Sequence, residues 1–246
     1  KEEDLEKAWN ESSRWSEKKS LLVESFESGL QISSESFLLS GKAFTPALSE
    51  RNYSRLDEFR PFIIEDGGTI PPLISEDLVE KINRLIEDGA KAMGVIDGIV
   101  KGDIVIDKTG NPLIVELALR LSGGWFASDQ IIAATGVDLV KVVMNQSLGI
   151  HVSNEDLQPI RKKSTSIRYW FPQPGKITNI NGVEKLNNIP GLLKYGFFRV
   201  SGDVQPQIRS HSDRFGYVIV EGKDRTETIS RVEQAIKSLD ITMTAS

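Results

Sequence analysis

Two apolar runs separated by a single turn occupy the middle of the chain. Residues 98–107 and 113–121 are rich in aliphatic and β-branched side chains, and the turn residues K-T-G-N lie between them. This pattern predicts a β-hairpin. If the turn is centred near its glycine, Asp103 lies roughly opposite Glu116 on the neighbouring strand.

The second of these strands carries charges that a buried strand cannot leave unpaired. With a period of two, one face holds Val115, Leu117, Leu119 and Leu121 and the other holds Ile114, Glu116, Ala118 and Arg120. The first face is expected to be core. Burying an unpartnered carboxylate or guanidinium costs several kcal/mol, as an order-of-magnitude estimate. Opposed carboxylates also repel each other unless a cation lies between them. A structural ion-pair cluster would provide such a cation, and so would Mg²⁺ bound together with phosphate.

Ser122, Gly123 and Gly124 follow this strand directly. Glycine lets backbone N–H groups approach an anion because no Cβ intervenes, and the guanidinium of Arg120 suits a carboxylate or phosphate. The pair is not part of a G-x-G-x-x-G motif, so a dinucleotide fold has little support. A carboxylate, an arginine and two glycines thus follow one another at the end of this strand, which favours an anion-binding site. The alternative interpretation is an ordinary turn beside a structural ion-pair cluster.

The rest of the chain predicts α/β architecture with largely antiparallel strands, in two parts joined near residue 150. Strands are expected at residues 20–26, 31–39, 166–171, 192–200 and 216–221. Helices are expected at residues 4–9, from Ser75 to Gly94, on both sides of Thr135-Gly136, and at residues 225–239. Residues 51–72, which include Gly67-Gly68, are expected to be an exposed loop.

Composition excludes several classes of function. The net charge of −5 with mixed signs gives no electrostatic support for a nucleic-acid partner. The absence of cysteine excludes disulfides and thiolate metal sites and makes a reducing cytoplasm the default. No apolar run approaches the roughly 20 residues of a membrane-spanning helix. The first residue is Lys1, so the sequence is expected to begin within a longer polypeptide.

The run G-I-V-K-G-D-I-V-I-D-K-T-G-N-P-L-I-V-E-L-A-L-R-L-S-G-G, followed by A-T-G-V-D-L-V, resembles the C-terminal half of an ATP-grasp domain. Biotin carboxylase, the carbamoyl-phosphate synthetase large chain and D-alanine–D-alanine ligase belong to this superfamily. The resemblance implies an α+β (α/β) fold. Residues 1–150 would form the C-terminal ATP-grasp subdomain, with a mainly antiparallel sheet flanked by helices. Residues 151–246 would form a small β-rich subdomain, which includes P-Q-P-G-K at 172–176.

The resemblance also implies a nucleotide site. Glu24, Ser25 and Phe26 match the hinge that hydrogen-bonds adenine, mostly through backbone groups. Gln31 stands where many members have a glutamate that holds ribose or supports metal. The implied cofactors are ATP and Mg²⁺, or Mn²⁺ in its place. The Gly-rich lid and the phosphate-binding lysines of the family have no counterpart here and are expected in a missing N-terminal part of the same polypeptide.

Further roles follow for the hairpin and the loop after it. Asp103 replaces the first metal-binding glutamate and Glu116 matches the second. Arg120 matches the arginine that contacts the reacting carboxylate or acyl phosphate, and Ser122 to Gly124 match the loop whose amides stabilise the oxyanion. The family pattern is E-x-N-x-R, and Ala118 stands in place of its metal-binding asparagine. This departure weakens the expectation of two metal ions.

The implied activity is that of a carboxylate–amine ligase. ATP would activate a small-molecule carboxylate as an acyl phosphate, and an amine would attack it to form a C–N bond. A non-catalytic nucleotide-binding or interaction module that retains the fold is the alternative, suggested by Ala118, Gln31 and the missing lid. A structural half-domain is the third reading. A cytoplasmic protein is expected, and a homodimer stays open.

Overall fold

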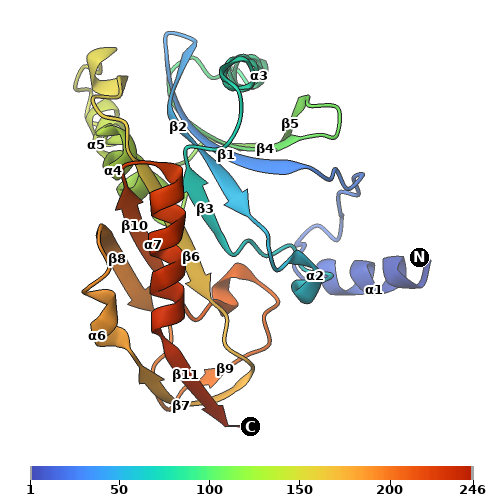
Figure 1. The fold of residues 1–246 in the computed structure, drawn as a ribbon. Coiled ribbons are helices and arrows are strands. Elements are labelled where there is room, and N and C mark those ends of the chain that lie inside the picture. Colours follow the sequence, from blue (N-terminus) through green and yellow to red (C-terminus); the bar gives the residue numbers. More distant parts are fainter. Residues whose placement is uncertain (1, 245–246) are drawn as a thin grey trace.

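The computed structural model describes residues 2–244, which contain eleven strands and seven α-helices (Figure 1). The strands are β1 Leu30–Leu39, β2 Lys42–Asn52, β3 Gly67–Ile70, β4 Gly98–Ile106, β5 Pro112–Ala118, β6 Ser164–Trp170, β7 Gly175–Asn181, β8 Leu192–Phe197, β9 Val204–Gln205, β10 Gly216–Gly222 and β11 Asp240–Thr244. The α-helices are α1 Glu2–Ser12, α2 Leu56–Phe59, α3 Glu76–Ala92, α4 Ile131–Thr135, α5 Leu139–Ser147, α6 Val183–Leu186 and α7 Arg225–Ser238.

Eight strands form one sheet in the order β5-β4-β1-β2-β3-β6-β10-β8, and every neighbouring pair is antiparallel. The pairing of β3 with β6 carries this sheet across residue 150. Strands β11, β7 and β9 form a second, smaller sheet, at the lower end of Figure 1. The predicted mainly antiparallel α/β fold is therefore confirmed, whereas the division into parts at residue 150 stays a prediction.

Three of the helices, α3, α5 and α7, begin at side-chain caps. Ser75 accepts a hydrogen bond from the Leu78 N–H at the start of α3, and Asp224 accepts one from the Glu227 N–H at the start of α7. Asp138 caps α5 in the same way. Each cap satisfies a backbone donor that has no partner inside its helix.

Helices α3 and α7 pack on the same face of the large sheet. Ile32 and Ile104 lie in the core cluster beneath α3, and Val218 lies in the cluster beneath α7. Because successive residues of a strand point to opposite faces, the neighbouring Ser33 and Asp103 point to the other face. Helices α4 and α5 cover only part of that second face. The part that they leave open contains the candidate site.

The expected loop at residues 51–72 contains a central strand instead. All four residues of β3 are buried between β2 and β6. A Cβ on Gly67 would lie 2.2 Å from the Ile167 carbonyl oxygen, and one on Gly68 would lie 2.8 Å from Ser49 Oγ. The Gly-Gly pair, which we expected to lie in an exposed loop, therefore allows close packing of strands.

A β-bulge alters the register of the hairpin formed by β4 and β5. Asp103 pairs with Glu116, which confirms the predicted juxtaposition of the two carboxylates. The next pair joins Ile104 to Ile114, so Val115 has no partner opposite.

The bulge reverses the expected burial of part of β5. Ile114 and Leu117 both point at Gly89 of α3, although strict alternation would place them on opposite faces. Val115 is 54% exposed and Leu119 is 58% exposed, so the expectation that both are core residues was wrong. A shift of one residue in the pairing of a strand moves each following side chain to the opposite face of the sheet.

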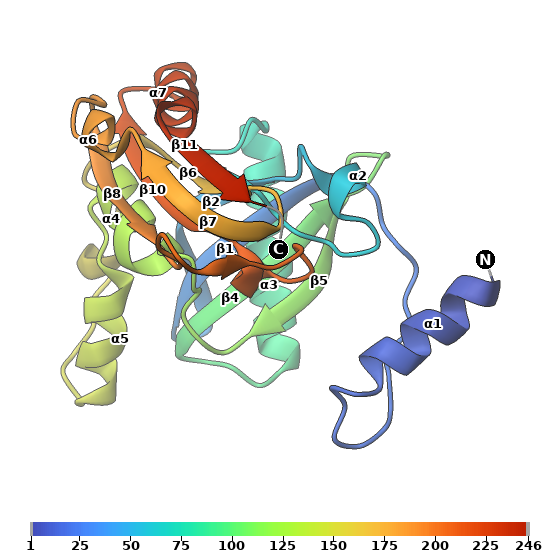
Figure 2. The same cartoon turned by 90° about the horizontal axis from the view of Figure 1, so that it is seen from below.

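The N-terminal segment also differs from expectation. Residues 20–26 form no strand, and the chain has no regular secondary structure there. Helix α1 contains the predicted residues 4–9 and projects away from both sheets, as the two views in Figures 1 and 2 show. Among residues 2–244, no helix is both long enough and apolar enough to cross a membrane.

Candidate active site

A cleft of about 330 Å³ opens on the sheet face that α3 and α7 leave uncovered. Its lining residues are Ser33, Ser49, Arg51, Glu65, Gly67, Gly68, Lys101, Asp103, Arg120, Ser122, Gly123, Gly124, Phe126, Gln130, Ile167, Tyr169, His211 and Arg214. Four of these residues are lysine or arginine, and only two are acidic. The excess of positive charge favours an anionic ligand.

Asp103 occupies the floor of the cleft and is already surrounded by hydrogen-bond donors. Its Oδ1 lies 3.2 Å from Nη1 of Arg51 and accepts a 3.3 Å hydrogen bond from the hydroxyl of Ser33. Its Oδ2 forms an ion pair with Lys101. The opposed Glu116 is more exposed, and its Oε1 lies 3.8 Å from Nζ of Lys101. The two carboxylates are thus joined through one ammonium group.

The metal-binding capacity of this pair is small. Within residues 2–244, no group of three or more histidine and acidic side chains is arranged to hold a metal ion. Ala118, whose position carries an asparagine ligand in the ATP-grasp pattern, supplies no donor atom. Two carboxylates suffice for one Mg²⁺ that is also held by nucleotide phosphates and water. Asp103 and Glu116 therefore fit one such ion and do not fit two.

Arg120 lies beyond the strand that was expected to carry it. Strand β5 ends at Ala118, and Leu119 and Arg120 form a bend. The Arg120 side chain is exposed and lines the cleft. Within the described part of the chain it donates one hydrogen bond, of 3.2 Å, to the Leu121 carbonyl oxygen. Its guanidinium has donors to spare for an incoming anion.

Glu35 holds the loop after Arg120 in place, and sequence reasoning missed it. The Ser122 N–H donates to both carboxylate oxygens of Glu35, at 3.1 Å and 3.0 Å. Glu35 is fully buried on β1, on the same strand face as Ser33. Burial raises the pKa of Glu35 to about 7, although the bonds from Ser122 and the charges of Lys101 and Arg120 oppose the shift.

This contact changes the expected role of Ser122. The three amides of the loop were expected to face an oxyanion together, but the Ser122 N–H is taken by Glu35. Within the described chain, the N–H groups of Gly123 and Gly124 donate to no protein acceptor. Ser122 Oγ and Gln130 Oε1 are buried beside them and have no hydrogen-bond partner among residues 2–244. Buried polar atoms of this kind require a ligand or water.

The opposite wall of the cleft comes from the C-terminal part of the chain. The Arg214 guanidinium stacks 3.7 Å above the ring of Tyr169 and pairs with Glu65, which also binds Arg51. Burial and the charge of Arg214 lower the pKa of His211, so this imidazole is neutral near pH 7. His211 belongs to a short 3-10 turn, and no local sequence signal places it on the cleft.

The proposed nucleotide-binding residues lie outside this lining. Glu24, Ser25 and Phe26 are exposed in the segment without regular secondary structure, and the Ser25 hydroxyl donates to Glu27. Gln31 lies on β1 and shares its face with Ser33. None of the four residues lines the cleft, so the adenine hinge stays a prediction.

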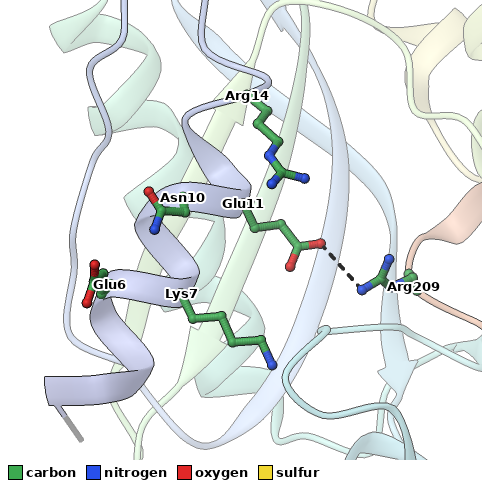
Figure 3. A pocket seen from close by; sticks show the side chains of 6 residues that line it. All are labelled: Glu6, Lys7, Asn10, Glu11, Arg14 and Arg209. Atoms are coloured by element: carbon green, nitrogen blue, oxygen red, sulfur yellow. Dashed lines mark ion pairs between the residues drawn. The ribbon is translucent and has the colours of Figure 1, made fainter.

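A second recess, of about 440 Å³, lies between α1 and Arg209 (Figure 3). Its lining residues are Glu6, Lys7, Asn10, Glu11, Arg14 and Arg209. One ion pair crosses it, between Glu11 and Arg209 at 3.9 Å. Exposed pairs at this distance contribute little, and no buried reactive group faces the recess.

Comparisons with known proteins give one family match and many structural matches. Residues 168–244 match the model of the L-amino acid ligase C-terminal domain 2. A search of curated proteins found no match. The L-amino acid ligase of Bacillus licheniformis superposes with a TM-score of 0.77 at 18% identity, over 89% of this chain and 55% of that chain. The chain has the fold of the C-terminal part of an ATP-grasp ligase.

Two further structures support this assignment of the fold. The phosphoribosylglycinamide synthetase of Anaerococcus prevotii gives a TM-score of 0.76 at 16% identity, covering 99% of this chain and 61% of that chain. The biotin carboxylase of Campylobacter jejuni, solved with β-γ-ATP, gives 0.66 at 17% identity and covers 100% of this chain and 54% of that chain. The present chain therefore spans a little over half the length of these ATP-grasp proteins.

Proposed function

We propose that the protein containing this chain is an ATP-dependent carboxylate–amine ligase. ATP would phosphorylate a carboxylate, and an amine would displace phosphate from the acyl phosphate to form a C–N bond. The support comes from the ATP-grasp fold and from the anion-binding geometry of the cleft. The N-terminal part of the same polypeptide would complete the nucleotide site.

The end of the hairpin carries this proposal. An exposed guanidinium and two unpartnered glycine amides, from Arg120, Gly123 and Gly124, converge on one cleft. Arg120 would bind the reacting carboxylate and then the acyl phosphate. The glycine amides would hold the oxygen that becomes negatively charged when the amine adds. Donors fixed before the reaction stabilise this charge without reorganisation.

Asp103 and Glu116 would hold the metal ion that enters with ATP. A bound Mg²⁺ would offset charge on the transferring phosphoryl group. Glu35 would act behind the loop, because its carboxylate fixes the Ser122 backbone and thereby the direction of the following two amides.

Amino acids are the substrates to test first. They are suggested by the match to the L-amino acid ligase domain. The matching residues of this chain, 168–244, include Tyr169, His211 and Arg214, which line the cleft. The experiment is an ADP-release assay on the full-length protein, with the twenty common amino acids tested in pairs and with a small panel of other acids and amines. ADP release that requires both a carboxylate and an amine would support the proposal.

The alternative is a nucleotide-binding module without catalysis. Ala118 and the ion pairs that already satisfy Asp103 favour it. This reading predicts saturable ATP binding by the full-length protein with no ADP release for any acid and amine in the panel. Calorimetry with ATP beside the release assay separates the two functions.

A further inference from the structure

Lys101 lies between the two carboxylates of the proposed metal site. Its ammonium group pairs with Asp103 and lies 3.8 Å from Oε1 of Glu116. The Lys101 side chain is only 12% exposed, so this is not a mobile surface lysine. A cation is therefore already present at the place where two opposed carboxylates need one.

The strand register explains how the lysine reaches this place. Lys101 pairs across the hairpin with Ala118, and Asp103 pairs with Glu116 two residues away. All four residues consequently lie on the cleft face of the sheet. The methyl group of Ala118 offers no oxygen to a metal ion, whereas an asparagine at this position would bring one.

We propose that the Lys101 ammonium replaces one of two metal ions at this site. This inference takes the identity of the bound nucleotide from the proposed function. The position of the ammonium group between the two carboxylates comes from the geometry alone. Lys101 would contact the nucleotide phosphates directly. One divalent ion would enter with ATP, and the nucleotide-free protein would take up none.

Charge balance gives the physical reason. Asp103 and Glu116 together carry two negative charges, and Lys101 with Arg51 supplies two positive charges within 4 Å of their oxygens. A free divalent ion would have to displace the ammonium group and would find only two protein ligands. Arg51 should stay on Asp103 in the absence of the lysine, because Glu65 also pairs with its guanidinium.

The test measures Mn²⁺ binding, by the loss of the paramagnetic resonance signal of free Mn²⁺, to the full-length protein without nucleotide. The informative variant is Lys101→Ala with Ala118→Asn, which removes the ammonium group and adds a third oxygen ligand. The matched control is Lys108→Ala with Ala118→Asn. Lys108 is an exposed residue of the same hairpin, so the control changes the net charge equally.

We expect the informative variant to bind Mn²⁺ at least about tenfold more tightly than the wild type, because it loses a competing cation and gains a ligand oxygen. Tenfold is about the lower end of the range by which groups that orient metal ligands change metal affinity. The control should bind no more tightly than the wild type. Equal Mn²⁺ affinity in the wild type and the informative variant would overturn the inference, as would equal gains in variant and control. If Lys101→Ala does not fold by circular dichroism, Lys101→Gln replaces it with the same expectations.

The outcome is independent of catalysis. A protein that releases no ADP with any substrate pair would contradict the proposed ligase, yet the Mn²⁺ titration would still report whether a lysine occupies the cation position. Conversely, an active ligase whose wild type binds Mn²⁺ tightly without nucleotide would contradict only the role of Lys101.

Discussion

Replacing Glu35 by glutamine tests the buried carboxylate that supports the glycine loop. Glu35 is inaccessible to solvent, and both of its oxygens accept the Ser122 N–H. Its pKa rises from 4.5 to about 7 because burial disfavours the charged form. A carboxyl group with a raised pKa lowers the free energy of unfolding as pH rises from its ordinary pKa through its folded one.

The magnitude follows from these two pKa values. Linkage gives an ionisation cost of about 1 kcal/mol near pH 5.5 and about 3 kcal/mol near pH 8. Glutamine at position 35 has no such cost, and its amide oxygen can still accept the Ser122 N–H. The stability of Glu35→Gln relative to wild type should therefore increase by about 2 kcal/mol between these pH values.

The assay is urea denaturation of the full-length protein near pH 5.5 and pH 8, followed by fluorescence. Glu17→Gln is the control, because Glu17 is exposed and its replacement should leave the pH dependence of the wild type unchanged. A Glu35→Gln variant whose stability difference from wild type is the same at both pH values would refute the reasoning. It would mean that Glu35 does not titrate between them.

Four substitutions test other parts of the account. Arg120→Lys keeps the charge but loses the planar fork, so turnover should fall roughly 10²–10³-fold in steady-state kinetics with ATP affinity unchanged. Glu116→Ala should abolish Mg²⁺-dependent turnover and leave the melting temperature unchanged, because the side chain is 56% exposed with one 3.8 Å ion pair; the opposite balance would indicate a structural cluster. Gly68→Ala should lower the free energy of unfolding by about 1–3 kcal/mol, since its Cβ would lie 2.8 Å from Ser49 Oγ. Gly123→Ala, where a Cβ meets nothing within 4 Å, should leave it unchanged.

The hairpin and its paired carboxylates could be predicted because their determinants are local. Turn chemistry sets the centre of the hairpin, and the distance from that centre places Asp103 opposite Glu116. Helix caps such as Ser75 and Asp138 are local for the same reason. The bulge at Val115 could not be predicted, because it depends on how β5 packs against α3.

The remaining half of the cleft depends on contacts between distant parts of the chain. Glu35 is one polar residue in the run Q-I-S-S-E-S, and nothing local shows that it lies behind Ser122, 87 residues later. Tyr169 and Arg214 reach the cleft only because β3, which we expected to be a loop, joins β2 to β6. Because this strand was not predicted, the C-terminal wall of the site could not be predicted either.

An oxygen-isotope experiment tests the proposed reaction most directly. The carboxylate substrate of an active pair is labelled with ¹⁸O in both oxygens, and the inorganic phosphate formed by the full-length protein is analysed by mass spectrometry. If an acyl phosphate forms and an amine attacks its carbonyl carbon, one ¹⁸O atom per turnover leaves with phosphate. Phosphate without label, formed at the same rate as product, would contradict the account, because ATP would then be cleaved without activation of the carboxylate.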